Sequence, residues 1–310
     1  MKKKYFLCSL YIFGSLALFA QGKDGKVLLQ SKSLSATVIK TVHAETEAGD
    51  ISITGVPGTD TRVDVMGKLD QQHKGLSVES AQKLVAENYD LSIDAQGTVL
   101  TVKVKTKPGG KSGINIYLVV HVPATVSGKL NTEGGTIRLD SLKGDITGST
   151  SGGDLYASHC SGDLTLSSAG GTIYLESLSG FTIAKTEGGS VKAKDISGTL
   201  KTSAAGGSLK LENLRCTLDA TTNAGFIEAS ILKVGEYARI QTSGGDGGIK
   251  LQLPAASGMN LDLKAGDIQS GSIESFKGIA DRRQVKGVTK GGGATIAADA
   301  GQGDIQLSFK

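Results

Sequence analysis

Glycine recurs at a nine-residue step through the middle of this 310-residue chain. The step is occupied at ten of eleven consecutive positions, and Cys216 stands at the exception. The ten glycines are Gly135, Gly144, Gly153, Gly162, Gly171, Gly180, Gly189, Gly198, Gly207 and Gly225. A second glycine precedes every other one, as in Gly134-Gly135, so the true repeat is eighteen residues made of two similar halves. Such a period is typical of repeat architectures, in which each unit buries its apolar side only against its neighbours.

Short strands are predicted after the periodic glycines, because aliphatic and polar residues alternate there, as in Ile137 and Leu139. A further apolar column repeats every eighteen residues at Leu142, Cys160, Leu178, Ile196, Leu214 and Leu232. A hydroxyl-rich column repeats at Thr150, Ser168, Thr186, Ala204 and Thr222. Residues eighteen apart should therefore stack at about 4.8 Å, and the periodic glycines should take corner conformations that a side chain would forbid. This pattern predicts an all-β solenoid of eighteen-residue coils.

Composition agrees with a folded solenoid and excludes a collagen-like chain. Glycine numbers 44 but proline only 4, and a collagen triple helix needs glycine at every third position with abundant proline. Hydrophobic residues make up 38% of the chain, enough for a sizeable core. The glycine excess therefore belongs to an ordered repeat.

The chain divides into three parts. Residues 1–20 are predicted to be a signal peptide, since three lysines precede an apolar run that ends at Ala20. Residues 21–128 form an N-terminal β-rich part of the solenoid with one helix, expected at Ser77–Tyr89. Residues 129–310 form the regular glycine-rich solenoid, with an irregular insertion at 269–293 and a last strand that closes the C-terminal end.

The predicted signal peptide indicates that the protein is exported, with the mature protein in the periplasm, at the cell surface or outside the cell. Removing three lysines changes the formal charge from +4 to 4 − 3 = +1, so nothing favours nucleic acid, and no membrane span is expected after cleavage. Cys160 and Cys216 should lie about 14 Å apart along the stack, whereas a disulfide needs Cα atoms within about 7 Å. Two free thiols are therefore predicted.

The segment His121–Val126, followed by Leu130–Ile137 and further T-x-x-G-G-x-[IL] coils, resembles the bacterial "putative adhesin" family of unknown function, which is related to head GIN adhesin domains. The resemblance covers roughly residues 36 to 310. It implies an exported, single-stranded, right-handed β-helix-like solenoid. It carries over no catalytic residues.

The residues predict neither a repeated calcium site nor a catalytic cluster. A calcium-binding β-roll needs aspartate at the sixth position of each repeat, where this chain has Leu139, Gly148 and Ala157. Asp145 and Asp163 should stack on successive coils, which leaves open whether they share a cation or cap turns. No cofactor is expected. The outward residues form no distinctive carboxylate pair, yet a carbohydrate-active β-helix enzyme, a polysaccharide lyase or hydrolase, remains the alternative.

One outward column combines aromatic and cationic residues and is the predicted binding site. Its members are Arg138, Tyr156, Tyr174, Lys192, Lys210 and, at its end, Glu228. Tyrosine rings can stack on sugar faces, and guanidinium or ammonium groups pair with carboxylates. Tyrosine also packs across strands without binding anything. The sequence thus predicts a non-catalytic, exported adhesin or cell-envelope scaffold that presents a flat face to a surface glycan or an envelope protein.

Overall fold

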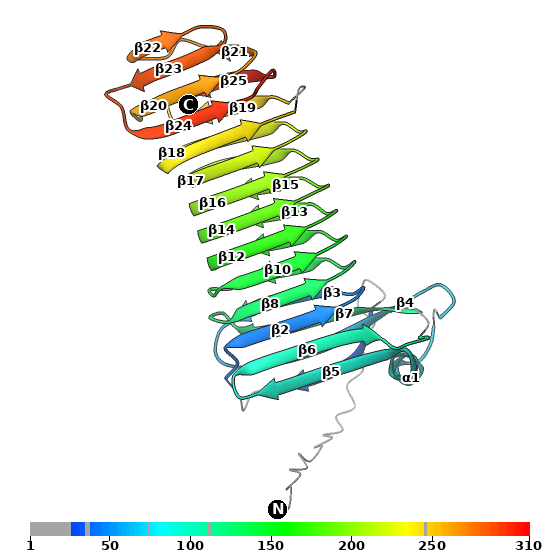
Figure 1. The fold of residues 1–310 in the computed structure, drawn as a ribbon. Helices are drawn as coiled ribbons and strands as arrows, with labels where there is room; N and C mark the ends of the chain where they lie inside the picture. Colours follow the sequence, from blue (N-terminus) through cyan, green and yellow to red (C-terminus); the bar gives the residue numbers. More distant parts are fainter. Residues whose placement is uncertain (1–25, 35–37, 74, 111–112, 245–246) are drawn as a thin grey trace, which may run out of the picture.

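The computed structural model describes residues 26–34, 38–73, 75–110, 113–244 and 247–310. The strands stack into a long solenoid with two opposing sheets, so the predicted fold is confirmed (Figure 1). The predicted signal peptide at 1–20 lies outside the described residues. The core between the sheets is aliphatic, and Cys160 and Cys216 are buried in it as free thiols, as predicted.

Each regular coil contributes one strand to each sheet. The sheet on the far side in Figure 1 is named the front sheet because it carries the predicted binding residues. It contains β9 (Ile137–Asp140), β11 (Leu155–Ser158), β13 (Ile173–Glu176) and β15 (Val191–Lys194). The back sheet contains β8 (Ser127–Thr132), β10 (Ile146–Thr150), β12 (Ser161–Ser168), β14 (Ser179–Thr186) and β16 (Ser197–Ala204). The long strands β17 (Leu209–Thr222) and β18 (Ile227–Thr242) each run through both sheets.

The eighteen-residue register is confirmed in the regular coils. Leu155 pairs in parallel with Ile137 on one side and with Ile173 on the other. The register shifts where β17 meets β18, and there Ile231 is buried opposite Leu214. The prediction that Leu232 continues the inward apolar column is therefore wrong. A shift of one residue turns the next side chain away from the core, which leaves Leu232 only partly buried.

The N-terminal end of the stack is folded back on itself. The coil made by β2 (Thr41–Thr46) and β3 (Asp50–Val56) lies between β8–β9 and a coil made by β6 (Val99–Thr106) and β7 (Ile114–Pro123). Antiparallel strands then extend both sheets outward: β5 (Tyr89–Gln96) on the back sheet, β4 (Arg62–Leu69) and β1 (Lys26–Ser33) on the front.

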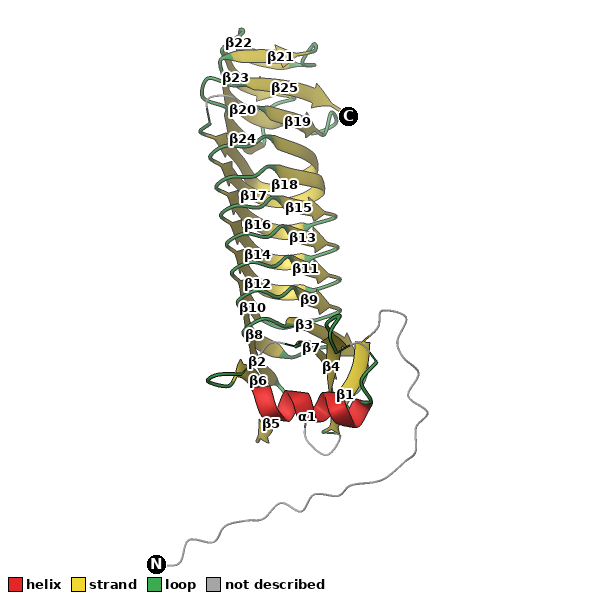
Figure 2. Ribbon diagram, turned by 90° about the vertical axis from the view of Figure 1, so that its right-hand side faces the viewer, coloured by secondary structure: helices red, strands yellow, loops and turns green. Residues whose placement is uncertain are grey.

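The single helix of the described chain, α1 (Val78–Asn88), crosses this end of the stack (Figure 2). Its predicted position is confirmed. The Ser77 hydroxyl caps it by accepting the Ser80 N–H, and Ala81 and Val85 are buried. The helix therefore covers the core where the coils stop.

Two expectations about the C-terminal end, an irregular insertion at 269–293 and a closing last strand, are wrong. Residues 269–293 are not irregular, because β22 (Phe276–Ala280) and β23 (Gln284–Thr289) form an antiparallel hairpin. Gly278 and Gly287 face each other across this hairpin at a close backbone approach. The hairpin pairs with β20 (Met259–Lys264) and reverses the chain direction.

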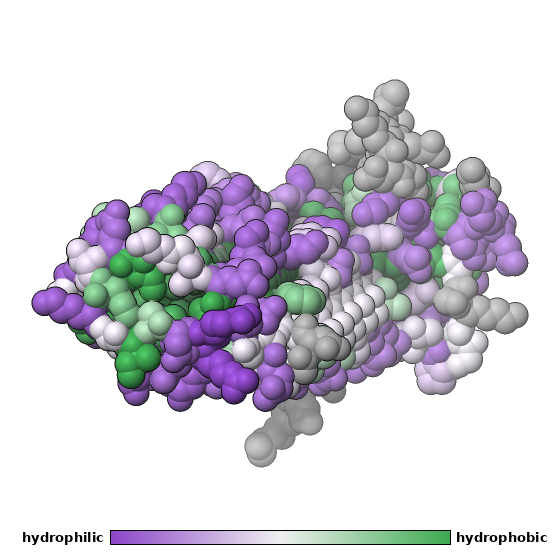
Figure 3. Space-filling view, turned by 90° about the horizontal axis from the view of Figure 1, so that it is seen from above, coloured by the Kyte–Doolittle hydropathy of each residue, from purple (hydrophilic) through white to green (hydrophobic). Residues whose placement is uncertain are grey.

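The last coil does not close the stack. Its strands β24 (Ala294–Asp299) and β25 (Asp304–Phe309) are inserted between earlier strands. Strand β24 lies between β18 and β20, and β25 lies between β19 (Ile249–Leu253) and β21 (Asp267–Ser270). Hydrophobic residues gather at the end that faces the viewer in Figure 3, where Ile279 of the hairpin is exposed. The coils nearest the two chain ends are thus held inside the ladders, where strands pair on both sides.

A buried hydroxyl ladder runs along one corner of the stack. The Ser168 hydroxyl accepts the Gly171 N–H at 2.8 Å and donates to the Gly153 carbonyl of the preceding coil at 2.9 Å. Thr150 and Thr186 make the same two bonds one coil away on either side. The hydroxyl-rich column predicted from the sequence therefore links successive coils, and its side chains are buried.

Candidate functional site

The predicted binding residues come together as one straight column on the outer face of the front sheet. Strand pairing places the members side by side in the order Arg138, Tyr156, Tyr174, Lys192, Lys210 and Glu228. Each member stands between two inward aliphatic residues of its strand, and successive side chains on a strand point to opposite faces. The alternation that builds the core therefore also presents this column to solvent.

The two tyrosine rings lie flat against each other. Their centroids are 4.6 Å apart and their planes differ by 2°. The Arg138 guanidinium lies 4.8 Å from the Tyr156 centroid, and the Lys192 ammonium lies 5.2 Å from that of Tyr174. The order is thus cation, ring, ring, cation, in which each cation is attracted to the electron-rich ring face.

This stacking changes how the tyrosines can contact a ligand. A sugar cannot stack on a ring face that a second ring or a cation already covers, so the ring edges and hydroxyl groups remain for contact. The Tyr156 hydroxyl donates to Asp154 at 3.3 Å. Burial and then the charge of Asp154 raise the pKa of Tyr156, which keeps this hydroxyl protonated at neutral pH.

The cations of the column differ in how they are paired. Arg138 contacts Asp50 at 3.6 Å, and Lys210 contacts Glu212 at 3.1 Å. The hydrogen bond that the Lys210 ammonium donates to Glu212 raises the pKa of Lys210. Within the described residues, Lys192 and Lys194 have no carboxylate partner within 4.0 Å. Lys194 stands in register between Glu176 and Glu212, so Lys192 is the ammonium group that is available to an external anion.

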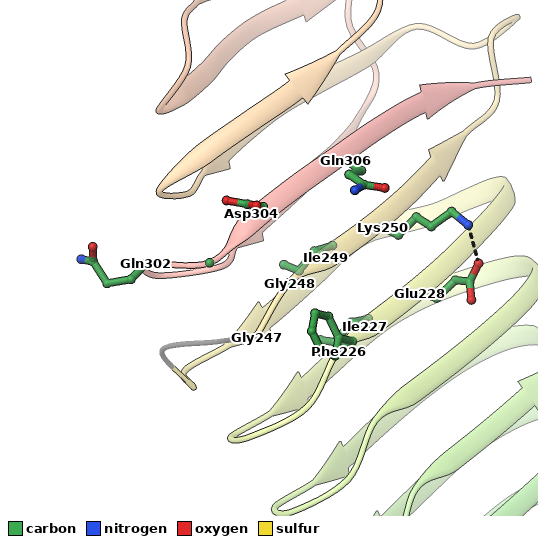
Figure 4. Close-up of a pocket in the computed structure, with 11 residues that line it drawn as sticks. Phe226, Ile227, Glu228, Gly247, Gly248, Ile249, Lys250, Gln302, Asp304 and Gln306 are labelled. Atoms are coloured by element: carbon green, nitrogen blue, oxygen red, sulfur yellow. Dashed lines mark hydrogen bonds and ion pairs between the residues drawn. The ribbon is translucent and has the colours of Figure 1, made fainter.

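The middle of the column, from Tyr156 to Lys210, lines a shallow groove of about 340 Å³. Lys192 and Lys194 form part of its lining, together with both tyrosines and Glu176. Two more hollows lie on the same sheet. One, of about 680 Å³, lies toward the N-terminal end beside Lys26, Tyr117 and Arg138. The other, of about 510 Å³, lies toward the C-terminal end around Phe226 (Figure 4).

Glu228, the last member of the predicted column, also lines the hollow around Phe226, but Phe226 itself does not belong to that column. Lys250 continues the column by pairing with Glu228, but twenty-two residues separate them instead of eighteen, so the periodic pattern does not reach it. Gln306 continues the column further, through the inserted strand β25. A usable signal was Phe226 itself, a large apolar residue at the position of Thr172, Ser190 and Ser208 in earlier coils.

The remaining sequence candidates have structural roles in the stack. The Asp145 carboxylate accepts the backbone N–H of Asp163 at 3.3 Å, which caps the next coil. No group of three or more His, Cys, Asp or Glu residues suited to a metal occurs in the part of the chain that is described. Burial raises the pKa of Cys160, and it raises that of Cys216 to about 12, so neither thiol ionises at neutral pH.

Asp140 is the acidic group next to the site with the most hydrogen bonds. It accepts from Ser158 at 2.7 Å and lies 3.1 Å from Nδ1 of His159. The bond from Ser158 is the main cause that lowers the pKa of Asp140. A glycosidase needs a general acid with a raised pKa, so Asp140 is unsuited to that role.

One family model matches most of the chain, and several solved structures are similar to it. A family model described as Toastrack DUF4097 matches residues 68–308, which confirms the resemblance indicated by the motifs at 121–137. A "putative adhesin" from Bacteroides fragilis NCTC 9343 is 12% identical over 91% of this chain and 96% of that one, with a TM-score of 0.42. A "putative lipid binding protein" from Parabacteroides distasonis ATCC 8503 is 11% identical over 92% and 98%, with a TM-score of 0.37. No curated protein matches the chain. No helix in the described part of the chain is long and apolar enough to cross a membrane.

Proposed function

The chain belongs to the Toastrack DUF4097 family, and from its own residues we propose that it is an exported, non-catalytic, adhesin-like protein whose front sheet binds an anionic glycan. The observation that carries this proposal is the stack of Arg138, Tyr156, Tyr174 and Lys192, of which the two tyrosines and Lys192 line one groove. The stack holds these side chains in fixed positions, so a ligand loses little affinity in ordering them.

Lys192 defines the ligand's charge. It lines the groove with no carboxylate partner within 4.0 Å among the described residues, so a uronate or another acidic sugar supplies an anion for it. The tyrosine edges then offer hydroxyl groups to neighbouring sugar hydroxyls. Because the coils repeat, a polymer lying along the stack meets the same face at successive sugars.

Binding is tested by titrating the protein with an oligogalacturonate in a calorimeter. Replacing both tyrosines, Tyr156→Ala with Tyr174→Ala, should weaken binding about tenfold, and Lys192→Ala should weaken it less and reduce its salt dependence. The matched control is the back-sheet pair of Phe181 and Lys201, which makes the same cation–ring contact at 5.4 Å. Phe181→Ala with Lys201→Ala should leave binding unchanged.

Two results would overturn parts of this proposal. Unchanged affinity in the double tyrosine variant would remove the column as the site. Release of reducing or unsaturated ends from the polysaccharide would instead identify a carbohydrate-active enzyme, since a binding protein leaves the chain length of its ligand unaltered.

A further inference from the structure

The hollow around Phe226 lies on the same face as the tyrosine column and has different chemistry. It is formed where β18, β19 and β25 lie side by side, and its volume of about 510 Å³ falls within the roughly 300–1,000 Å³ range of small-molecule sites. Phe226 lies on one side of Gly248 in the close-up, with Asp304 and Gln306 on the other (Figure 4). The hollow therefore has an apolar wall and a polar wall.

Phe226 presents its ring to solvent. The residue is 62% exposed, although it stands in a strand-edge column that elsewhere holds Thr172, Ser190 and Ser208. The next residue in the column is Gly248, and a Cβ there would lie 3.3 Å from Cδ1 and Cε1 of the Phe226 ring. The ring thus lies over the Gly248 backbone, at a position where no side chain displaces it.

The ring face is also free of the partners that cover the tyrosines. Within the described residues, neither an aromatic ring nor a cation stacks on Phe226. An exposed, uncovered phenyl face is costly in water and suits the C–H face of a sugar, whose hydrogens meet the negative face of the ring.

The polar wall offers side chains that can hydrogen-bond a ligand. The side chains of Asp304 and Gln306 bond to no other described residue, whereas Glu228 and Lys250 pair with each other at 3.0 Å. The charges of Glu228 and Lys250 cancel, so the lining of the hollow carries a net charge of one negative unit, from Asp304. This charge repels a uronate, while a carboxylate and an amide accept and donate to the hydroxyl groups of a neutral sugar.

We infer that the Phe226 hollow is a second subsite, which takes a neutral hexopyranose unit stacked on Phe226 and hydrogen-bonded by Asp304 and Gln306. The inference rests on the proposed function, because it assumes that the front sheet binds glycans. It adds a specificity: the tyrosine column takes the acidic part of a ligand and the Phe226 hollow takes a neutral part.

The test titrates the full mature chain with four neutral hexasaccharides, of the cello-, malto-, manno- and chito- series, by saturation-transfer NMR and calorimetry. At least one should bind, and Phe226→Ala should weaken that binding about tenfold, whereas Phe226→Tyr should retain it. Gly248→Ser restores the residue type of the regular coils and fills the hollow, so it should weaken binding about as much. The melting temperature of each variant checks that the fold is intact.

The tyrosine variants separate this inference from the proposed function. Tyr156→Ala with Tyr174→Ala should leave neutral-sugar binding unchanged while it weakens oligogalacturonate binding. Failure of all four neutral sugars, or equal binding by Phe226→Ala, would overturn the second subsite even where oligogalacturonate still binds. A wild-type protein that binds a neutral hexasaccharide but does not bind oligogalacturonate would instead overturn the proposed function and leave the second subsite supported.

Discussion

Each coil turns twice, and the two corners use special backbone positions for different reasons. At the glycine corner, between the back and front strands, the glycines are Gly135, Gly153, Gly171, Gly189, Gly207 and Gly225, and none of them has a positive φ. A Cβ at any of them would overlap the carbonyl oxygen of a glycine one coil below. At the opposite corner Ser141, His159, Ser177, Asp195 and Asn213 have φ between 53° and 56°, a left-handed conformation.

Glycine is favoured at the two corners for two different reasons. The glycine corner demands close approach, which only a residue without a side chain can provide. The opposite corner demands a left-handed residue, which polar side chains fill at a modest cost in strain. Glycine also serves that corner three residues after the left-handed residue, where Gly162, Gly180 and Gly198 have φ of 110°, 106° and 95°.

The largest effect is expected from adding one methyl group at the glycine corner. Gly171→Ala should lower the free energy of unfolding by about 3 kcal/mol, because the new Cβ overlaps the Gly153 carbonyl and forces the ladder to part. Urea unfolding followed by circular dichroism measures the change.

The adjacent glycine is the matched control for that change. A Cβ on Gly170 would meet its nearest neighbour, the Ser151 carbonyl oxygen, at 3.5 Å, which is ordinary contact. Gly170→Ala should therefore change stability by less than about 0.5 kcal/mol. Equal losses in the two variants would show that close approach is not what distinguishes the corner.

The glycine step made the regular coils predictable, because strands eighteen residues apart are also neighbours in space. That relation fails at both ends. Tyr237 pairs with Thr295 of the inserted coil, and no repeat length connects these two residues. The repeat length also fails to connect Lys250 with Gln306, which pair at the end of the outward column. A periodic sequence therefore predicts consecutive coils and says nothing about a coil inserted after a chain reversal.

The candidate site was predictable in its membership but not in its geometry. Column spacing was enough to place Tyr156 beside Tyr174. Whether the rings stack flat on each other or leave their faces open depends on side-chain rotation, which spacing does not determine. The two tyrosine rings stack flat and cover each other's faces, so the exposed aromatic ring on this sheet is that of Phe226.

The next effect concerns the hydroxyl that stabilises the glycine corner. Ser168→Ala should lower the free energy of unfolding by about 2 kcal/mol, because it leaves the buried Gly171 N–H and Gly153 carbonyl without this partner. Ser167→Ala is the control, since Ser167 is exposed on the same strand and should change stability little. If Ser168→Ala behaves like Ser167→Ala, the ladder contributes nothing and the corner depends on close approach alone.

A smaller effect of opposite sign is expected where the ladder is interrupted. Ala204 stands in register between Thr186 and Thr222, so its coil lacks the hydroxyl that would join the Gly207 N–H to the Gly189 carbonyl. Ala204→Ser should raise the free energy of unfolding by about 1 kcal/mol, because it adds two hydrogen bonds in a buried position. A melting temperature equal to or below that of the wild type would contradict this prediction.

The smallest effect is expected at the left-handed corner, where glycine is permitted but not required. Ser177 has a φ of 54°, is exposed, and makes no side-chain hydrogen bond to a described residue. Ser177→Gly removes the left-handed strain but increases the entropy of the unfolded chain, so the net gain in the free energy of unfolding should be about 0.5 kcal/mol. Ser177→Val provides the contrast, because a β-branched residue tolerates positive φ poorly, and it should destabilise the protein. A gain at Ser177 alongside a loss for Gly171→Ala would establish that one corner selects backbone handedness and the other selects the absence of a side chain.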